Sequence, residues 1–162
     1  MRSKQSAGIL LFRRTGGEYE VLLVHPGGPL WARKDEGAWS IPKGEFGDEE
    51  APLQAALREF AEEVGFRPEG PYQELDPVRQ SGGKTVYCWL AQGDCDPGQL
   101  QSNTFEMEWP PRSGRRQQFP EVDRAEWFTL SEARRRINKA QAAFLNNLEG
   151  SPQDNAIGGS QV

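Results

Sequence analysis

The segment that most constrains the fold of this chain is residues 44–66, GEFGDEEAPLQAALREFAEEVGF. It begins in a stretch rich in glycine and acidic residues, and its later part predicts a helix over residues 51–64. Within that helix, hydrophobic side chains recur with a 3.6-residue period at Leu53, Leu57, Phe60 and Val64. We therefore expect one face of the helix to pack on a core.

A second face of the same helix is acidic. Glu59, Glu62 and Glu63 are three or four residues apart, so their carboxylates converge. Like charges at this spacing cost about 0.2–0.5 kcal/mol per pair, and the negative end of the helix dipole disfavours them further. Clustered carboxylate oxygens suit Mg²⁺ or Mn²⁺. The alternative is a solvated acidic face that binds nothing.

The spacing of the whole segment resembles the Nudix box, G-x5-E-x7-R-E-U-x-E-E-x-G-U, where U is a bulky hydrophobic residue. All the fixed identities of this pattern are present between Gly44 and Gly65. The two bulky positions are Phe60 and Phe66, where an aliphatic residue is more usual, and this difference concerns packing, not chemistry. The chain is identified by this resemblance as a member of the Nudix hydrolases.

The resemblance implies an α/β fold, an α/β/α sandwich around a mixed β-sheet, with the box as a loop–helix–loop at the active site. It also implies a cofactor, Mg²⁺ with Mn²⁺ as a possible substitute. The expected ligands are the backbone carbonyl of Gly44 and the carboxylates of Glu59, Glu62 and Glu63.

The same resemblance suggests how catalysis would be divided among the box residues. Glu59 or Glu62 could orient or deprotonate the attacking water, and the sequence does not separate ligand from base. Arg58 is expected to pair with a carboxylate, and Glu50 to support the geometry from outside the metal site.

Two residues outside the box are candidate members of the same site. Lys43 precedes Gly44 and would put a cation beside a bound phosphate. Glu121 lies six residues before Trp127, a spacing similar to that of an additional metal-binding glutamate in some Nudix enzymes. We favour a metal-binding Glu121 over a surface acid, with Glu106 and Glu108 as rivals.

Two predicted loops carry further candidates for substrate binding. His25, the one histidine, precedes a Gly- and Pro-rich loop and could contact phosphate or act as a turn residue, while Trp31 either covers the site or packs. The loop over residues 110–120 carries three arginines that would suit terminal phosphates or form solvated surface. They are Arg112, Arg115 and Arg116.

The remaining elements follow from alternation and turn residues. In the strand after a Ser-Gly-Gly turn, Tyr87 and Trp89 either stack on a base or pack beneath the terminal helix. Ser131 is the expected N-cap of a helix reaching Ile137. The predicted strands cover residues 6–12, 19–24, 39–42, 72–80, 84–92, 105–109 and 126–130, and a second helical segment covers residues 139–148.

Composition fits one domain over residues 1–150 followed by a flexible polar tail over residues 151–162. A net charge of −5 argues against nucleic acid as a partner. Cys88 and Cys95 are expected to be reduced thiols in a cytoplasmic protein, with no secretion signal and no membrane span. A homodimer is possible, because many Nudix enzymes dimerise.

The predicted function is a Mg²⁺-dependent pyrophosphohydrolase that cleaves a diphosphate linkage in a nucleoside-diphosphate-linked small molecule. Nucleoside triphosphates and dinucleoside polyphosphates are the leading substrates. The alternatives within the enzyme class are diphosphoinositols and nucleotide sugars or ADP-ribose. The alternative outside it is a non-catalytic Nudix-like nucleotide-binding regulatory module, against which the intact set of acids argues.

Overall fold

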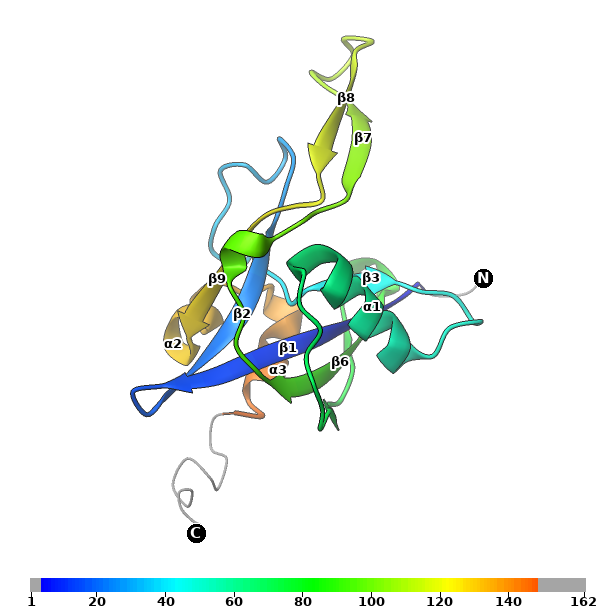
Figure 1. The fold of residues 1–162 in the computed structure, drawn as a ribbon. Helices are drawn as coiled ribbons and strands as arrows, with labels where there is room; N and C mark the ends of the chain where they lie inside the picture. The colour runs from blue at the N-terminus through cyan, green and yellow to red at the C-terminus, as the bar shows by residue number, and fades with distance from the viewer. Residues whose placement is uncertain (1–3, 149–162) are drawn as a thin grey trace.

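A computed structural model describes residues 4–148 as a mixed seven-stranded sheet with helices on both faces and a projecting two-stranded arm (Figure 1). The main path of the sheet runs β4-β6-β1-β2-β9, with β3 paired to β1 and β5 paired to β6. Its strands are β1 (Gln5–Thr15), β2 (Glu18–Pro26), β3 (Lys43–Glu45), β4 (Gln73–Glu74), β5 (Val78–Arg79), β6 (Thr85–Gln92) and β9 (Val122–Thr129).

The sheet is mixed because its central strand has neighbours of both directions. Strand β1 pairs parallel with β6 and antiparallel with β2 and β3. The predicted strands over residues 6–12 and 19–24 are confirmed as β1 and β2, each longer than expected.

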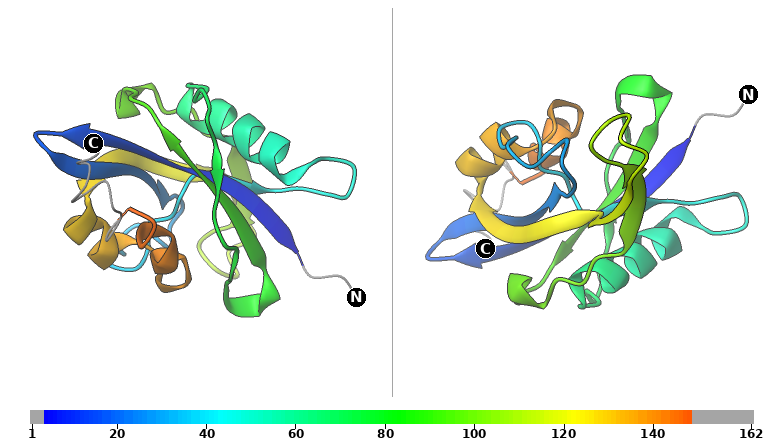
Figure 2. Two further views of the ribbon diagram at one scale, coloured as in Figure 1. Left: turned by 90° about the horizontal axis from the view of Figure 1, so that it is seen from below. Right: turned by 90° about the horizontal axis from the view of Figure 1, so that it is seen from above.

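Each face of the sheet is covered by helix, which confirms the predicted α/β/α sandwich. Helix α1 (Pro52–Val64) covers one face, and α2 (Leu130–Arg136) and α3 (Ala142–Leu145) cover the other (Figure 2). In β1, Leu10 joins the core under α2 and α3, whereas Ile9 and Leu11 join the core under α1. Burial on both faces explains why β1 is apolar at successive positions.

Strand β6 divides its side chains in the same way. Val86, Cys88 and Leu90 belong to the core under α2 and α3, as the alternation predicts. Tyr87 and Trp89 lie on the opposite face and pack in the core with α1. These aromatics pack, as one of the two predicted alternatives has it, but they pack against α1 and not beneath the terminal helix. The terminal helices α2 and α3 cover the other face.

The local sequence determines where helix α1 begins and ends. Pro52 occupies the first turn, where the missing N–H has no helical partner to lose. Gly65 ends the helix with a φ of 76°, and its N–H bonds the Ala61 carbonyl. A side chain is disfavoured at that φ, so the glycine stops the helix directly after the acidic face.

The arm consists of β7 (Thr104–Glu108) and β8 (Arg116–Pro120), which form a separate antiparallel sheet projecting from the body (Figure 1). The prediction of one loop over residues 110–120 is wrong for its second half. Strand β8 reads RQQFP and lacks the alternation that identifies a buried strand, because most of its side chains are exposed. Its register with β7 stabilises it instead.

Other local predictions also need correction. Residues 39–42 form two isolated bridges, Trp39 with Ile137 and Ser40 with Val24, not a strand. The N-cap of α2 is Thr129, whose hydroxyl accepts from the Glu132 N–H, not Ser131. The second helical segment contains η3 (Lys139–Gln141) before α3; the short helices η1 (Ser81–Gly83) and η2 (Pro97–Gln99) lie earlier in the chain.

Two further observations concern the rest of the chain. Cys88 and Cys95 are both free thiols, as predicted. Within residues 4–148, the helices are too short and too polar to span a bilayer. The predicted tail over residues 151–162 lies outside the described residues.

Candidate active site

The candidate site lies where the C-terminal half of α1 crosses β3 and the segment before β9. Helix α1 contributes Glu59, Glu62 and Glu63, and β3 contributes Lys43 and Gly44. The side chains of Lys43 and Glu63 line one small cavity together with Glu121, the residue that precedes β9. The fold thus brings together acids from distant parts of the sequence.

Gly44 allows the closest of these approaches. A Cβ atom at this position would lie 2.0 Å from the Glu59 carboxyl carbon, so any larger residue would force the Glu59 carboxylate to move. The Glu59 carboxylate therefore lies directly against the backbone of β3. Because β3 pairs with β1 through Gly44 and Ala7, this backbone is fixed by the sheet.

Arg58 organises the outer side of the acidic cluster. Its Nε and Nη2 donate to the two carboxylate oxygens of Glu50, each at 2.8 Å, and its Nη1 donates to Glu59 at 2.9 Å. The hydrogen bond to Arg58 lowers the pKa of Glu50. The predicted pairing of Arg58 with a carboxylate is confirmed, and Glu50 holds the guanidinium in a bidentate contact.

Glu62 is the most open of the three helix acids. Its side chain is 47% exposed, and its nearest ion-pair contact is Arg58 Nη1 at 3.7 Å. Glu59 is more enclosed, and burial is the main cause that raises its pKa, with the hydrogen bond from Arg58 acting against the increase. The two candidates for the general base therefore differ in access to solvent.

Glu63 is the most unusual acid in the site. The residue is only 4% exposed, and its Oε1 atom has no hydrogen-bond partner. Burial, followed by the charges of Glu59 and Glu121, raises its pKa from 4.5 to about 8. A buried polar atom without a partner is costly, so a carboxylate in this position calls for a ligand.

Lys43 provides a positive charge at the same cavity. Burial lowers the pKa of its ammonium, and the nearby carboxylates of Glu63 and Glu59 act in the opposite direction. The cavity has a volume of about 190 Å³ and is walled elsewhere by the apolar side chains of Val24, Ile41 and Val122. A cation and two acids thus face one another across a largely apolar pocket.

The residues rivalling Glu121 for a metal-binding role have other partners. Glu106 pairs with Arg116 at 3.2 Å, and Glu108 Oε2 accepts from the Gly114 N–H at 2.7 Å. Both contacts lie within the arm. Glu121, by contrast, is close enough to Glu59 and Glu63 to raise the pKa values of both.

The donor set fits a hard divalent cation, although in this conformation no group of three His, Cys, Asp or Glu side chains within residues 4–148 is spaced to hold one. Arg58 occupies one oxygen of Glu59, which keeps that carboxylate turned towards the guanidinium. A bound cation would give the unpaired Oε1 of Glu63 a partner. It would also reduce the repulsion between Glu63 and the charges of Glu59 and Glu121.

His25 does not take part in this cluster. Its ring is fully buried; Nδ1 lies 2.9 Å from an Asp123 carboxylate oxygen, and Nε2 lies 2.6 Å from the Lys34 carbonyl oxygen. The ring also packs edge-on against Trp39. Neither ring nitrogen is free for the expected phosphate contact, and His25 instead ties β2 to the following loop and to β9.

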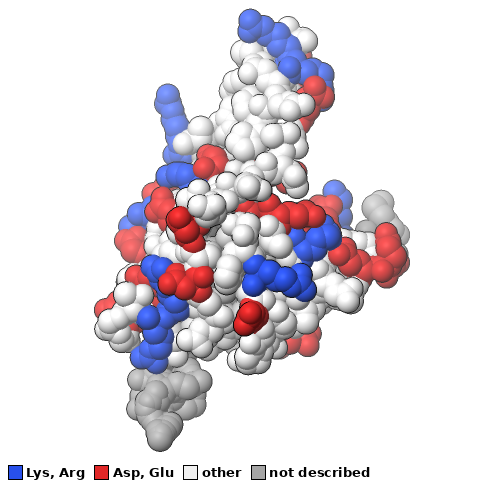
Figure 3. Space-filling model, in the orientation of Figure 1, with Lys and Arg blue, Asp and Glu red and all other residues white. Residues whose placement is uncertain are grey.

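The three arginines of the predicted loop are also separated from the carboxylates. The chain folds back as β8, so Arg112 and Arg115 lie in the turn at the tip of the arm and Arg116 begins the returning strand. Figure 3 shows basic side chains gathered at this tip, well beyond the acidic side chains near the body. Of the two alternatives for these arginines, the structure favours exposed surface over a position beside the metal site.

Two other cavities flank or oppose this site. A cleft of about 290 Å³ between the loop after β2 and strand β7 is lined by Trp31, Phe105 and Met107 and reaches Glu121. The alternation of Phe105 and Met107 with Glu106 and Glu108 predicts the strand, but it does not by itself place these two side chains in a cleft beside the site. A larger cavity of about 500 Å³, lined by Phe12, Tyr19 and Tyr72 among others, contains none of the predicted site residues.

Comparison with known proteins identifies the family of this chain. The NUDIX domain family matches residues 2–148, which include every element described above. The chain belongs to the Nudix hydrolase family.

Two curated relatives match parts of the chain. A nucleoside triphosphate pyrophosphatase/Nudix hydrolase fusion protein from Bifidobacterium longum is 27% identical over 132 residues, covering 65% of this chain and 27% of the relative. An RNA pyrophosphohydrolase from Cellvibrio japonicus is 45% identical over 51 residues, covering 30% of each protein. The matches thus span less than a third of the length of these relatives.

Solved structures share the fold at low sequence identity. An Ap4A hydrolase from C. elegans, in a binary complex, superposes with a TM-score of 0.61 at 22% identity, covering 88% of this chain and 94% of that one. At this identity the similarity establishes the architecture and leaves the substrate open.

Proposed function

We propose that this protein is a Mg²⁺-dependent pyrophosphohydrolase that cleaves a diphosphate linkage in a nucleoside-diphosphate-linked small molecule. Nucleoside triphosphates and dinucleoside polyphosphates are the leading substrates. The observation that carries the proposal is the buried, unpartnered Oε1 of Glu63, which faces the same cavity as Lys43 and Glu121. A buried carboxyl group among other acids either binds a proton, as the raised pKa of Glu63 indicates, or is ionised beside a compensating positive charge such as a metal ion.

The residues that would hold the cation are Glu59, Glu62, Glu63 and Glu121, with the carbonyl of Gly44. Mg²⁺ would supply charge neutralisation on the diphosphate and a lower pKa for a bound water; Mn²⁺ is a possible substitute. Lys43 supports the proposal as a fixed cation beside the phosphates.

Arg58 and Glu50 have a positioning role in this proposal. Their bidentate pair fixes the guanidinium, which in turn orients the carboxylate of Glu59. Either Glu59 or Glu62 would then accept the proton of the attacking water at a carboxylate oxygen. The greater exposure of Glu62 gives it the easier access to water.

A hydrolysis screen tests the proposal. The panel contains canonical and oxidised nucleoside triphosphates, dinucleoside polyphosphates, ADP-ribose, nucleotide sugars and diphosphoinositols, each with Mg²⁺ and with Mn²⁺. The inactive reference is Glu62→Gln, and the matched control is Glu74→Gln, which removes an exposed acid from β4. We expect metal-dependent release of products from a nucleotide substrate, lost in Glu62→Gln and retained in Glu74→Gln.

Two results would overturn this proposal. Full activity of Glu62→Gln with Mg²⁺ would show that the assignment of the metal site is wrong. Binding of nucleotides without turnover on any substrate would favour the regulatory module instead. A cytoplasmic location belongs to the same proposal and is supported by the two free thiols, whereas dimerisation stays a prediction.

A further inference from the structure

The cleft beside the carboxylates lies between a loop and a strand. One wall is the loop after β2, with Leu30 and Trp31, and the other is strand β7 of the arm, with Phe105 and Met107. Glu121 closes the end that faces the active site. The cleft is therefore apolar and aromatic along its length and acidic only at the junction.

Close backbone packing holds the two walls together. The Gly27 N–H donates to the Glu121 carbonyl at 2.9 Å, and a Cβ at Gly27 would lie 2.1 Å from the Pro120 carbonyl oxygen. At Gly28, where φ is 95°, a Cβ would lie 2.8 Å from the Phe105 ring. These contacts require glycine, and they make the base of the cleft a preformed feature of the fold.

The side chains on the loop wall are unusually exposed for their type. Leu30 is 59% exposed and Trp31 is 40% exposed, whereas most large hydrophobic side chains in the described residues are covered. Leu30 and Trp31 are neighbours in the chain and both line the cleft, and contiguous exposed apolar side chains are typical of binding surfaces. Lys34 Nζ lies 5.5 Å from the Trp31 ring centroid and contributes to its orientation.

The cleft adjoins the cavity that holds the acids. Both are lined by Pro26 and Glu121, and Lys43 and Glu63 lie on the far side of that boundary. One ligand can thus reach both, with its phosphates near Lys43 and an apolar part between loop and arm. The volume of about 290 Å³ is at the lower limit for ligand pockets and suits a ring system better than a whole nucleotide.

We propose that this cleft binds the heteroaromatic base of a nucleotide whose diphosphate lies at the carboxylates. The inference rests on the proposed function and narrows it, because it selects nucleotides over diphosphoinositols. A flat base can stack on Trp31 and Phe105 through its π face. An inositol ring would lose the hydration of its hydroxyl groups against these walls and gain few hydrogen bonds in return.

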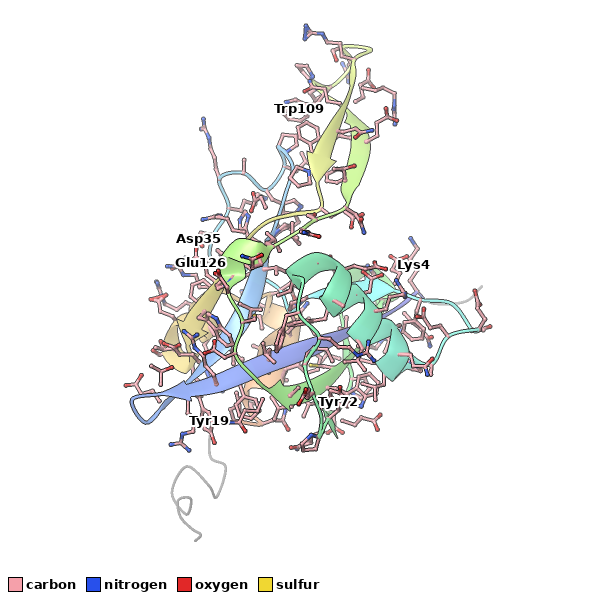
Figure 4. The ribbon with its side chains drawn as sticks, in the orientation of Figure 1. Lys4, Tyr19, Asp35, Tyr72, Trp109 and Glu126 are labelled. Carbon is pink, nitrogen blue, oxygen red and sulfur yellow. The ribbon has the colours of Figure 1, made fainter. Side chains whose placement is uncertain are left out.

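The test measures binding of a probe that resists hydrolysis. α,β-Methylene-ADP carries a base, a ribose and a P–C–P bridge, and methylenediphosphonate keeps the P–C–P bridge without the base and the ribose; both are titrated calorimetrically with Mg²⁺. The variants are Trp31→Ala on the exposed loop and Phe105→Ala on β7. The control is Trp109→Ala, an aromatic of the arm outside the cleft (Figure 4).

We expect α,β-methylene-ADP to bind the wild type at least about 10-fold more tightly than methylenediphosphonate. Trp31→Ala and Phe105→Ala should each remove most of that difference without changing the affinity for methylenediphosphonate, and Trp109→Ala should preserve it. Equal affinities for the two probes in the wild type, or a Trp31→Ala variant that binds both probes as the wild type does, would overturn the inference.

These outcomes are separable from those of the hydrolysis screen. Base-dependent binding through Trp31 in a protein without turnover would leave the cleft assignment standing and remove the proposed activity. Nucleotide turnover by the wild type, together with unchanged probe binding in Trp31→Ala, would support the proposed activity and contradict the assignment of the cleft.

Discussion

The carboxylate cluster and the arm differ in how the fold supports them. The acids are carried by a helix packed on the central sheet, and one of them lies against the backbone of Gly44. The arm is a two-stranded sheet outside the main sheet, with most side chains of β8 exposed (Figure 1). In the proposed function, the chemical step would take place on the sheet and helix of the body, and the apolar end of the substrate would contact the exposed loop and arm.

The largest effect is expected from Gly44→Ala, which tests how tightly the rigid part is built. The new Cβ would displace the Glu59 carboxylate, and a misplaced catalytic group costs about 100-fold in turnover. Steady-state kinetics on the substrate identified by the screen would measure the loss. Gly47→Ala is the matched control, because its Cβ also meets the end of a glutamate, Glu49, but this glutamate is not one of the proposed metal ligands. Equal activity of the two variants would contradict the proposed role of the Gly44 backbone.

The next effect concerns stability and pH at Glu63. Because its pKa is raised to about 8 in the folded protein, the folded state binds a proton more readily than the unfolded state. Stability without metal should therefore fall as pH rises from about 4.5 to about 8. Glu63→Gln should be more stable than the wild type above this range, by a few kcal/mol, and no more stable below it.

Denaturant unfolding at pH 4, 6 and 9 without metal would measure that difference. Added Mg²⁺ should narrow it by stabilising the wild type. Glu74→Gln serves as the control, since its exposed acid belongs to no cluster. A constant difference between Glu63→Gln and the wild type across pH would show that packing, not charge, causes the effect.

A smaller effect is expected from Arg58→Lys. Lysine keeps the charge but cannot bond both oxygens of Glu50 and hold Glu59 at the same time. We expect kcat to fall about 10-fold, with little change in thermal stability because the pair is partly exposed. Arg135→Lys, in an exposed ion pair with Glu36 and Glu132, should leave kcat unchanged. A similar loss in both variants would argue against a positioning role for Arg58.

The smallest effect is expected at the tip of the arm. Combined Arg112→Gln, Arg115→Gln and Arg116→Gln substitutions remove the basic cluster far from the carboxylates (Figure 3). KM and kcat should stay within about threefold of wild type, because exposed charges separated from the phosphates are screened by salt. An increase in KM above about 10-fold at physiological ionic strength would mean that the arm folds over the bound substrate.

Much of the candidate site was predictable because its residues are close in sequence. Helical geometry alone brings Glu59, Glu62 and Glu63 together. Arg58 and Glu50 are two of the fixed positions on which the family resemblance rests. Arg58 was predicted to pair with a carboxylate, and it pairs with Glu50. The alternating faces of β6 were also predictable, since strand geometry fixes them locally.

Only the tertiary structure decided the rest. Pairing with β7 made a strand of the exposed segment Arg116–Pro120 and placed Arg116, together with Arg112 and Arg115 of the preceding turn, on the arm away from the acids. Packing between β2, β9 and the following loop buried His25 and used both of its ring nitrogens. Pairing of β2 with β9 through Pro26 and Val122 brought Glu121 beside the loop wall of the cleft. These contacts join residues far apart in the chain, and their free energies depend on the whole fold, so local sequence patterns do not encode them.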